Sequence, residues 1–236
     1  MKVLSVVCAR AGSKGLKNKC IEKIGQKMVI EYTIEYSLSL GEDVRTIVST
    51  DINEVIDYCK KKNIEFIDRK MNLCTDESEI EDALADAINK TGSGVEYCSL
   101  AYGNVPTRYP HLFQNAFNFL EENKDYDAVI SMQNVEKYNP EWMFDYVEDV
   151  LPKKKTLHYR RQMLPQKMIH DGHTTIFRVD KFMDKYNSKV DYDSEYQYSM
   201  FGDKIKPMIN NEVIIDIDTL KDIKIADYFI NGGNIK

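Results

Sequence analysis

A stretch rich in glycine and lysine near the start of the chain has the composition of an anion-binding loop. Residues 9–20 read ARAGSKGLKNKC and directly follow the apolar run VLSVV. Glycines allow tight turns that present backbone N–H groups, and cations supply the countercharge that a polyphosphate needs. We therefore expect this stretch to hold a highly charged anion, with a solvated basic loop as the alternative. Its glycines are Gly12 and Gly15, and its cations are Arg10, Lys14, Lys17 and Lys19.

The stretch matches neither of two common nucleotide motifs. It lacks the GxxxxGK[ST] pattern of P-loop proteins and the GxGxxG fingerprint of dinucleotide-binding proteins. The anion must therefore be held by a loop of another kind.

Two carboxylates near the C-terminus could bind a hard cation. Asp216 and Asp218 are two residues apart at the end of the apolar run EVII. If the backbone is extended there, both carboxylates project from the same side. Mg²⁺ prefers one or two protein carboxylates together with phosphate oxygens and waters. The alternative is that Asp218 caps the helix expected after it.

The segment HDGH contains two histidines, His170 and His173, with Asp171 between them. Such a group could bind a second metal, contact a phosphate or phosphonate, or act as a general base. A purely structural role, with one histidine exposed and the other hydrogen-bonded, is equally consistent with the pattern. Zinc is the weakest option, because no further Cys or His is placed to complete its shell.

The elements that must position these residues alternate between strand and helix. Short runs rich in β-branched residues predict strands, and amphipathic repeats predict the helices between them. We expect an asparagine or aspartate cap on the second helix, a serine cap on the third and proline at the start of the fourth. Alternation of this kind implies an α/β fold, with a mostly parallel, Rossmann-like sheet flanked by helices. The expected strands are 2–8, 44–50, 64–69, 94–102 and 126–133, and the helices 29–40, 53–63, 78–90 and 110–123.

The alternation stops at about Asn139. We interpret residues 139–190 as an insertion or flap on the sheet, within one domain that spans residues 1–236. The segment NNEVIIDIDTLKDIKIADYFI is expected to close the chain as strand, acidic turn and helix. In such a sheet the loop after the first strand is the usual phosphate site. The glycine- and lysine-rich stretch occupies that position.

Composition narrows the class of protein. A net charge of −6 argues against generic nucleic-acid binding, and the positive charge is local. There is no run of eighteen apolar residues, so no membrane span is expected. The apolar segment in MKVLSVVCARAGSKG is too short and too soon interrupted by charge for a signal peptide. The five cysteines form no CxxC pair, which indicates reduced thiols and a cytoplasmic protein.

The motifs together resemble those of the acylneuraminate (sialic acid) cytidylyltransferases, a family that joins CMP from CTP to an acidic sugar. CARAGSKGLKNK is similar to the N-terminal signature of that family, and the closing acidic motif is equally specific. Three intervening segments occur in the same order and extend the resemblance over nearly the whole chain. These segments are VSTD (48–51), LAYGNVPTR (100–108) and YRRQMLP (159–165), before the closing IDIDTLKDIKIAD (215–227).

The resemblance implies roles for the charged residues. It implies that Asp216 and Asp218 bind Mg²⁺, while cations of the first loop stabilise the pyrophosphate leaving group. Whether either aspartate also accepts the proton of the acceptor stays open. The cytosine would lie over the backbone near Ala9, Gly12 and Ser13. The expected catalytic residues are Arg10, Lys14, Lys19, Asp216 and Asp218, and the expected nucleotide-binding residues are Ala9, Arg10, Ala11, Gly12, Ser13, Lys14 and Lys19.

The positions that would contact the acceptor depart from the family pattern. Tyr102 stands where the family has glutamine, and 171–175 replace an Asn-Gly-Ala-Ile-Tyr type of segment. Cys20 replaces an asparagine and is expected to pack as a small side chain under the loop. The flap still offers guanidinium groups for an anion. The expected acceptor-binding residues are Tyr102, Arg108, Arg160, Arg161, Gln162, Lys167, Asp171 and His173.

From this resemblance we expect a Mg²⁺-dependent cytidylyltransferase that acts on a nonulosonate-like acidic sugar. The same CMP transfer to a phosphonate- or phosphate-bearing metabolite is one alternative. A non-catalytic, nucleotide-binding regulatory protein is another. The family also implies a homodimer, in which some flap residues serve the partner.

Overall fold

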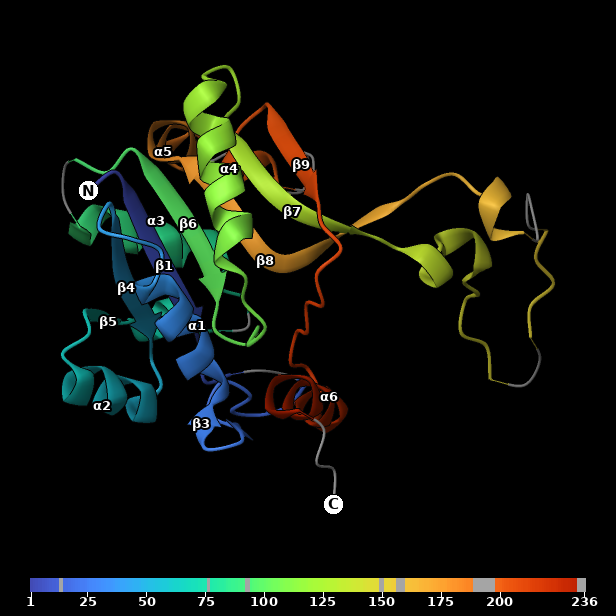
Figure 1. Cartoon of the computed structure of the whole chain (residues 1–236), viewed down its shortest axis with the longest axis horizontal. Coiled ribbons are helices and arrows are strands. Elements are labelled where there is room, and N and C mark those ends of the chain that lie inside the picture. The colour runs from blue at the N-terminus through green and yellow to red at the C-terminus, as the bar shows by residue number, and fades with distance from the viewer. Residues whose placement is uncertain are drawn as a thin grey trace.

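A seven-stranded sheet forms the centre of the protein in the computed structural model, which describes residues 1–12, 15–75, 77–91, 94–148, 151–155, 160–188 and 198–232 (Figure 1). Its strand order is β5-β4-β1-β6-β8-β7-β9, and β8 alone runs antiparallel to its two neighbours among these strands. The predicted α/β fold with a mostly parallel sheet is thus confirmed. The strands are β1 (Val3–Ala9), β4 (Val44–Thr50), β5 (Phe66–Asp68), β6 (Tyr97–Tyr102), β7 (Ala128–Asn134), β8 (Met168–Arg178) and β9 (Ile205–Ile209).

Helices cover both faces of the sheet because the strands are apolar on both sides. On one face, alternate residues of β1 such as Val7 pack against α1 and α2. On the other face, Leu4 and Val6 pack with α3 and with the aromatic residues of β8 and α5. Each fully buried aliphatic side chain contributes about 1.5–3 kcal/mol to the free energy of folding, so the two cores stabilise the sheet. The helices are α1 (Val29–Leu38), α2 (Asn53–Lys62), α3 (Ile80–Thr91), α4 (Pro110–Glu122), α5 (Val179–Asn187) and α6 (Leu220–Asn231).

The start of α2 differs from the capping prediction. Its N-cap is Ile52, which makes no side-chain cap hydrogen bond. The Ile52 N–H instead donates to the hydroxyl of Thr50, 3.1 Å away, which belongs to the preceding strand. The predicted proline at the start of α4 is confirmed, since Pro110 is its first residue.

The closing segment is the main departure from the expected strands. Residues 211–218 are extended but lie outside the sheet, and the edge position is taken by β9. The segment instead runs beside the loop that follows β6: the Ile217 N–H donates to Asn104 O at 2.9 Å, and the Ile215 N–H to the Thr107 hydroxyl at 2.8 Å. Ile215 and Ile217 are buried in a small core with α6 and with the short hairpin of β2 (Lys23–Ile24) and β3 (Lys27–Met28).

Only the first part of the expected insertion projects from the sheet. Residues 135–167, which we call the arm, leave the body at the end of β7 and return at the start of β8 (Figure 1). The Val135 N–H donates to Lys167 O at 3.1 Å and closes the base of the arm. The rest of the region 139–190 that the structure describes, β8 and α5, belongs to the body. The arm carries three short 3-10 turns, η2 (Glu136–Tyr138), η3 (Pro140–Trp142) and η4 (Arg161–Met163).

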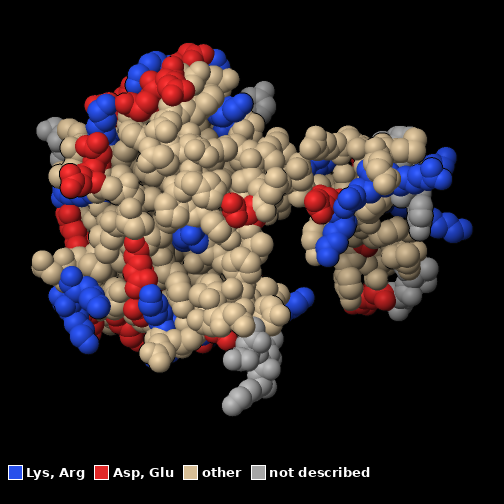
Figure 2. All heavy atoms as spheres, viewed as in Figure 1, with Lys and Arg blue, Asp and Glu red and all other residues tan. Residues whose placement is uncertain are grey.

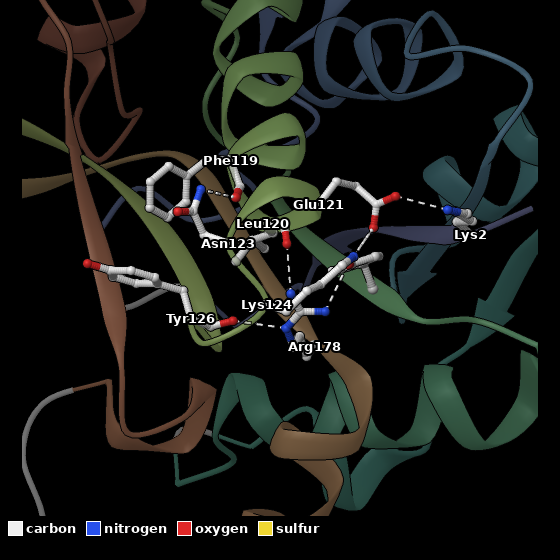
Figure 3. Close-up of polar contacts among 9 residues, drawn as sticks. Lys2, Phe119, Leu120, Glu121, Asn123, Lys124, Tyr126 and Arg178 are labelled. Carbon is white, nitrogen blue, oxygen red and sulfur yellow. Dashed lines mark hydrogen bonds and ion pairs between the residues drawn. The ribbon is translucent and has the colours of Figure 1, made fainter.

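A cluster of hydrogen-bonded polar residues lies at the end of the sheet where β6 begins (Figure 3). Arg178, at the end of β8, donates to Tyr126 O at 2.9 Å and to Leu120 O at 2.7 Å. Glu121 accepts from Lys2 at 2.9 Å and from Lys124 at 2.8 Å. The cluster joins α4 to the chain start and to β8. None of the helices described in the structure is long and apolar enough to cross a membrane.

Candidate active site

Two adjoining pockets lie where β1 and β6 end. The first, of about 320 Å³, is bordered by the loop that follows β1, and we call it the β1-loop pocket. The second, of about 510 Å³, is bordered by β8, and we call it the β8 pocket. Lys19, Tyr102 and Asn104 line both pockets and form the boundary between them. Asp218 lines the first pocket and Asp216 lines the second.

The strand order explains why the crevice is here. The chain continues from β1 to β4 and β5 on one side of the sheet and from β6 to β7 on the other, and ligands of open α/β sheets bind at such a switch point. Gly103 allows the close approach of the two strand ends. A Cβ at this position would lie 3.0 Å from Cys8 O and 3.1 Å from Ala9 Cβ. Its N–H donates to Cys8 O at 2.9 Å, and the next residue, Asn104, therefore faces the crevice.

The acidic pair is positioned by the segment that runs beside the β6 loop. Ile215 and Ile217 point into the core, so Asp216 and Asp218 project from the opposite side, as the spacing predicted. The side-chain N–H of Asn104 donates to Asp216. Lys19 Nζ lies 2.7 Å from an oxygen of Asp218. The predicted helix cap is supplied by Thr219, whose hydroxyl accepts from the Asp222 N–H, and not by Asp218.

The electrostatics of this pair suit a divalent cation. Burial in the crevice, and then the nearby charge of Asp218, raise the pKa of Asp216 to about 6. Two neighbouring carboxylates repel each other when both are charged, and a cation bound between them offsets this repulsion. The donor set of two carboxylates leaves room for phosphate oxygens and waters, which fits the preference of Mg²⁺. Among the described residues there is no cluster of three or more His, Cys, Asp or Glu that would hold a metal without such help.

The structure places part of the first loop around the β1-loop pocket. Ala9, Arg10, Gly15 and Lys19 line it. Arg10 Nη1 donates to Thr75 O at 2.7 Å, which brings the turn after η1 (Met71–Leu73) to the rim of the pocket. Ala11 and Gly12 are exposed nearby without lining the pocket, while Ser13 and Lys14 lie outside the described residues.

Cys20 packs beneath this loop. Its exposed fraction is 4%, and burial raises the pKa of its thiol to about 12. The expectation of a small packed side chain agrees with this placement. A thiol in this state is not a nucleophile at neutral pH.

Arg69 is a pocket residue that the sequence interpretation missed. It follows β5, is 5% exposed, and lines the β1-loop pocket. Its guanidinium donates to the carbonyl and the hydroxyl of Ser49 at 2.8 and 3.1 Å, which holds the side chain against the end of β4. The signal that could have found it is a cation at the end of a predicted parallel strand, because all such strand ends meet at one edge.

A wide bulge in β8 shapes the second pocket. Thr175 pairs with Ile130 and His170 with Met132, so four residues of β8 stand opposite Ser131 alone. Asp171 holds the bulge: its carboxylate accepts from the Ser131 hydroxyl, from the Asn210 side chain and from the His173 N–H. Bulges often re-aim side chains beside functional sites. Here the bulge turns His170, Asp171 and Gly172 toward the β8 pocket.

Two of the predicted acceptor-binding residues lie elsewhere. His173 is 1% exposed, and its Nε2 accepts from the Tyr109 N–H at 2.8 Å. Burial and the neighbouring Arg108 lower the pKa of His173 to about 2, so the ring is a neutral core residue. Arg108 donates to the carbonyls of Tyr102, Val105 and His173 and lines neither pocket. Both residues brace the β6 loop against β8.

The remaining predicted acceptor residues belong to the arm. Arg160, Arg161, Gln162 and Lys167 are exposed and line neither pocket of their own chain. Arg161 lies 3.6 Å from Glu136 within the arm. Figure 2 shows the arm standing apart from the body, with lysine and arginine gathered on it. Of the predicted acceptor residues, Tyr102 and Asp171 are therefore the two that line the crevice.

Comparison with known proteins points to one family. A sequence profile described as cytidylyltransferase matches residues 4–231. An N-acylneuraminate cytidylyltransferase of Streptococcus agalactiae is 31% identical over 140 residues, which cover 58% of this chain and 33% of that protein. The matched region is thus about a third of that relative's length. The post-translational flagellin modification protein B of Campylobacter coli is 24% identical over 100% of this chain and 97% of its own.

A solved structure has the same fold. The structure of CMP:2-keto-3-deoxy-manno-octonic acid synthetase complexed with CTP superposes with a TM-score of 0.75 and 16% sequence identity. The superposition covers 98% of this chain and 99% of the other.

Proposed function

Because this chain belongs to the cytidylyltransferase family, we propose that it transfers CMP from CTP to an acidic, nonulosonate-like sugar and releases pyrophosphate. The observation that carries the proposal is the pair of pockets that meet at Lys19, Tyr102 and Asn104, with one aspartate facing each. Such an arrangement suits two substrates that react across the boundary. The relative from Streptococcus agalactiae is named for N-acylneuraminate, and a CMP-N,N'-diacetyllegionaminic acid synthase of Campylobacter jejuni is 31% identical over 98 residues. Both names support an acidic sugar as the acceptor.

In this proposal CTP occupies the β1-loop pocket. Arg69 contacts a polar edge of the base, because a buried guanidinium at the pocket wall favours a carbonyl partner. Arg10 and Lys19 neutralise the triphosphate, and Lys14, in the same loop, is expected to assist. The glycines of the loop allow its backbone to approach the phosphates.

The acceptor occupies the β8 pocket, and its hydroxyl oxygen attacks the α-phosphorus in line. The new oxygen–phosphorus bond forms as the bond to the bridging oxygen of the β-phosphate breaks, and pyrophosphate leaves. Asp216, which lines the β8 pocket, accepts the hydroxyl proton, and Lys19 stabilises the growing charge at the boundary. No covalent protein intermediate is needed.

We propose Mg²⁺ as the cofactor, held by Asp216 and Asp218. When bound, it supplies Lewis-acid polarisation of the α-phosphate and lowers the pKa of a coordinated hydroxyl. Asn104 orients the Asp216 carboxylate for this role through its side-chain hydrogen bond.

We also propose that the enzyme is a cytoplasmic homodimer that assembles through the arm. All five cysteines are unpaired, which suits a reducing compartment. The arm exposes large apolar side chains, and Tyr146 and Leu151 are 91% and 69% exposed. Exposed apolar groups that project from a body usually mark an interface. Arg160, Arg161, Gln162 and Lys167 would then serve the partner's acceptor.

The test is pyrophosphate release from CTP and Mg²⁺ with a panel of acidic sugars. We expect release with at least one nonulosonate, together with a CMP-sugar product. Asp216→Asn and Asp218→Asn should each lower kcat by about 10²–10³-fold with a smaller effect on CTP binding. Asp180→Asn, on an exposed position of α5, is the matched control and should keep wild-type turnover. Absence of turnover with every acidic acceptor would refute the proposal.

A further inference from the structure

His170 presents an unused hydrogen-bonding atom to the β8 pocket. Its Nε2 lies 3.4 Å from the Thr175 hydroxyl, and its Nδ1 has no hydrogen-bond partner among the described residues. In that part of the chain no side-chain nitrogen or oxygen is both buried and unpaired. Nδ1 is therefore accessible, and it belongs to a residue that lines the β8 pocket. Nothing in the mechanism above uses this atom.

The imidazole ring is held in a defined orientation. It lies against the rings of Tyr102 and Tyr198, with centroid distances of 6.2 and 5.3 Å and interplanar angles of 60° and 74°. Next to it, both carboxylate oxygens of Asp171 accept hydrogen bonds within the protein, from Ser131, Asn210 and the backbone. Asp171 is thus committed to holding the bulge, which leaves His170 as the side chain of this bulge that can meet a ligand.

We propose that His170 recognises a neutral hydrogen-bonding substituent on the acceptor, an acylamino or hydroxyl group on its tail, and thereby sets the acceptor preference. The assignment rests on the proposed function, because it places the acceptor in the β8 pocket. The reacting end of the acceptor lies at the boundary with Lys19 and Asp216. The tail then extends toward His170, Gln133 and the apolar side chains of Ile169 and Ile214.

The charges around the pocket favour a neutral tail over a second anionic group. Lys19 is the one cation among the described residues that line the β8 pocket, and it already pairs with Asp218 at 2.7 Å. Asp171 and Asp216 add negative charge to the same walls. Burial lowers the pKa of His170, which keeps its ring neutral at pH 7. A phosphate or phosphonate on the tail would lose hydration without finding countercharge, which is costly.

The experiment compares His170→Phe and His170→Asn with wild type. Pyrophosphate release is followed with CTP, Mg²⁺ and each of four acceptors: an N-acylneuraminate, N,N'-diacetyllegionaminic acid, pseudaminic acid and a small phosphonate. For the best acceptor, His170→Phe should raise the acceptor KM by about tenfold or more, because it keeps the ring but removes the hydrogen bond. His170→Asn should recover part of this loss. The KM for CTP and the melting temperature should stay at wild-type values in both.

The controls separate this assignment from a structural role and from the proposed function. His111→Asn alters a half-exposed histidine that lines neither pocket and should keep wild-type kinetics. Wild-type acceptor KM in His170→Phe would overturn the His170 assignment while leaving the function intact. Faster turnover of a phosphonate than of every nonulosonate would overturn the proposal that the acceptor tail is neutral. A wild-type enzyme that is silent with all acceptors would overturn the proposed function and the His170 assignment that rests on it.

Discussion

At the scale of single residues, Lys19 links the two halves of the site. It lines both pockets, its side chain is 19% exposed, and it pairs with Asp218. In the proposed reaction, a lysine in this position would contact the triphosphate and the acceptor in turn without a change of backbone. The Lys19 ammonium group pairs with the Asp218 carboxylate, and a bound phosphate would compete with that carboxylate for it. The boundary between the two pockets therefore contains an ion pair, between Lys19 and Asp218.

Glu121 gives a residue-scale prediction for stability against pH. Hydrogen bonds from Lys124, Tyr97 and Lys2 lower the pKa of Glu121 to about 2, below the ordinary value near 4.3. A carboxyl group with a depressed pKa stabilises the fold above its unfolded pKa, and this contribution disappears as the pH falls toward 2. Glu121→Gln should therefore lower the melting temperature at pH 7. The difference from wild type should shrink between pH 4 and pH 2.

Calorimetry of both proteins over this pH range tests the prediction. Glu122→Gln changes the neighbouring residue of α4 and serves as the control, with little expected effect. An undiminished difference at pH 2 would show that the Glu121 charge is not the cause.

The sequence was informative about residues whose role depends on local pattern. Asp216 and Asp218 alternate with buried isoleucines, so their common side could be predicted from periodicity alone. The two histidines could not be assigned in this way. His170 and His173 belong to one strand, and which of them faces the pocket is decided by the bulge opposite Ser131. That bulge depends on hydrogen bonds from β7 and from residue 210, which are distant in sequence.

At the scale of elements, Gly103 controls how closely β6 approaches β1. Gly103→Ala would place a methyl group against backbone and side-chain atoms of Cys8, Ala9 and Ile30 at 3.0–3.2 Å. Overpacking of this kind costs about 1–3 kcal/mol. We expect the variant to lose this much unfolding free energy. Turnover should fall too, because Asn104 and its hydrogen bond to Asp216 follow directly.

Urea unfolding of Gly103→Ala and of Gly41→Ala compares crowding without a positive φ with a positive φ without crowding. Gly41 has a φ of +114° but no atom within 4 Å of an added Cβ, so that variant suffers backbone strain alone. If Gly103→Ala had the same stability and turnover as wild type, the close approach of the two strands would be contradicted.

Element prediction succeeded where hydrophobic period and turn residues agree. The five predicted strands and four predicted helices up to residue 134 all occur, with ends that differ by a few residues. Prediction failed for β9, whose sequence IKPMI contains a proline and lacks a clear alternation. Proline is tolerated there because β9 is an edge strand. The segment EVII has the composition of a strand, yet it packs on the β6 loop and α6 instead.

At the scale of the whole molecule, the predicted resemblance to cytidylyltransferases is confirmed by a profile match over residues 4–231. The arm is the part of the molecule that the fold of the body does not explain. A pocket of about 630 Å³ lies at its base, lined by residues of both the arm and the segment 210–212. The sequence indicated an irregular region here. The length of the arm could not be predicted, because it is set by the pairing of β8 with β6 and β7, which are distant in sequence.

The arm gives a prediction for the proposed dimer. Wild-type protein should sediment at twice the chain mass of 27.4 kDa. Tyr146→Glu combined with Leu151→Glu should shift it to the monomer mass, because charges in an apolar interface remain uncompensated. Leu38→Glu, which is on the exposed end of α1, is the control and should leave the dimer intact. A monomeric wild type at micromolar concentration would exclude the proposed dimer.

The bulge of β8 also has an evolutionary consequence. The residues that it presents, 170–172, line the β8 pocket but not the β1-loop pocket. Under the proposed assignment, substitutions there would change the acceptor preference without altering the residues that line the β1-loop pocket. A new acceptor would then require changes in only a few codons of a single strand.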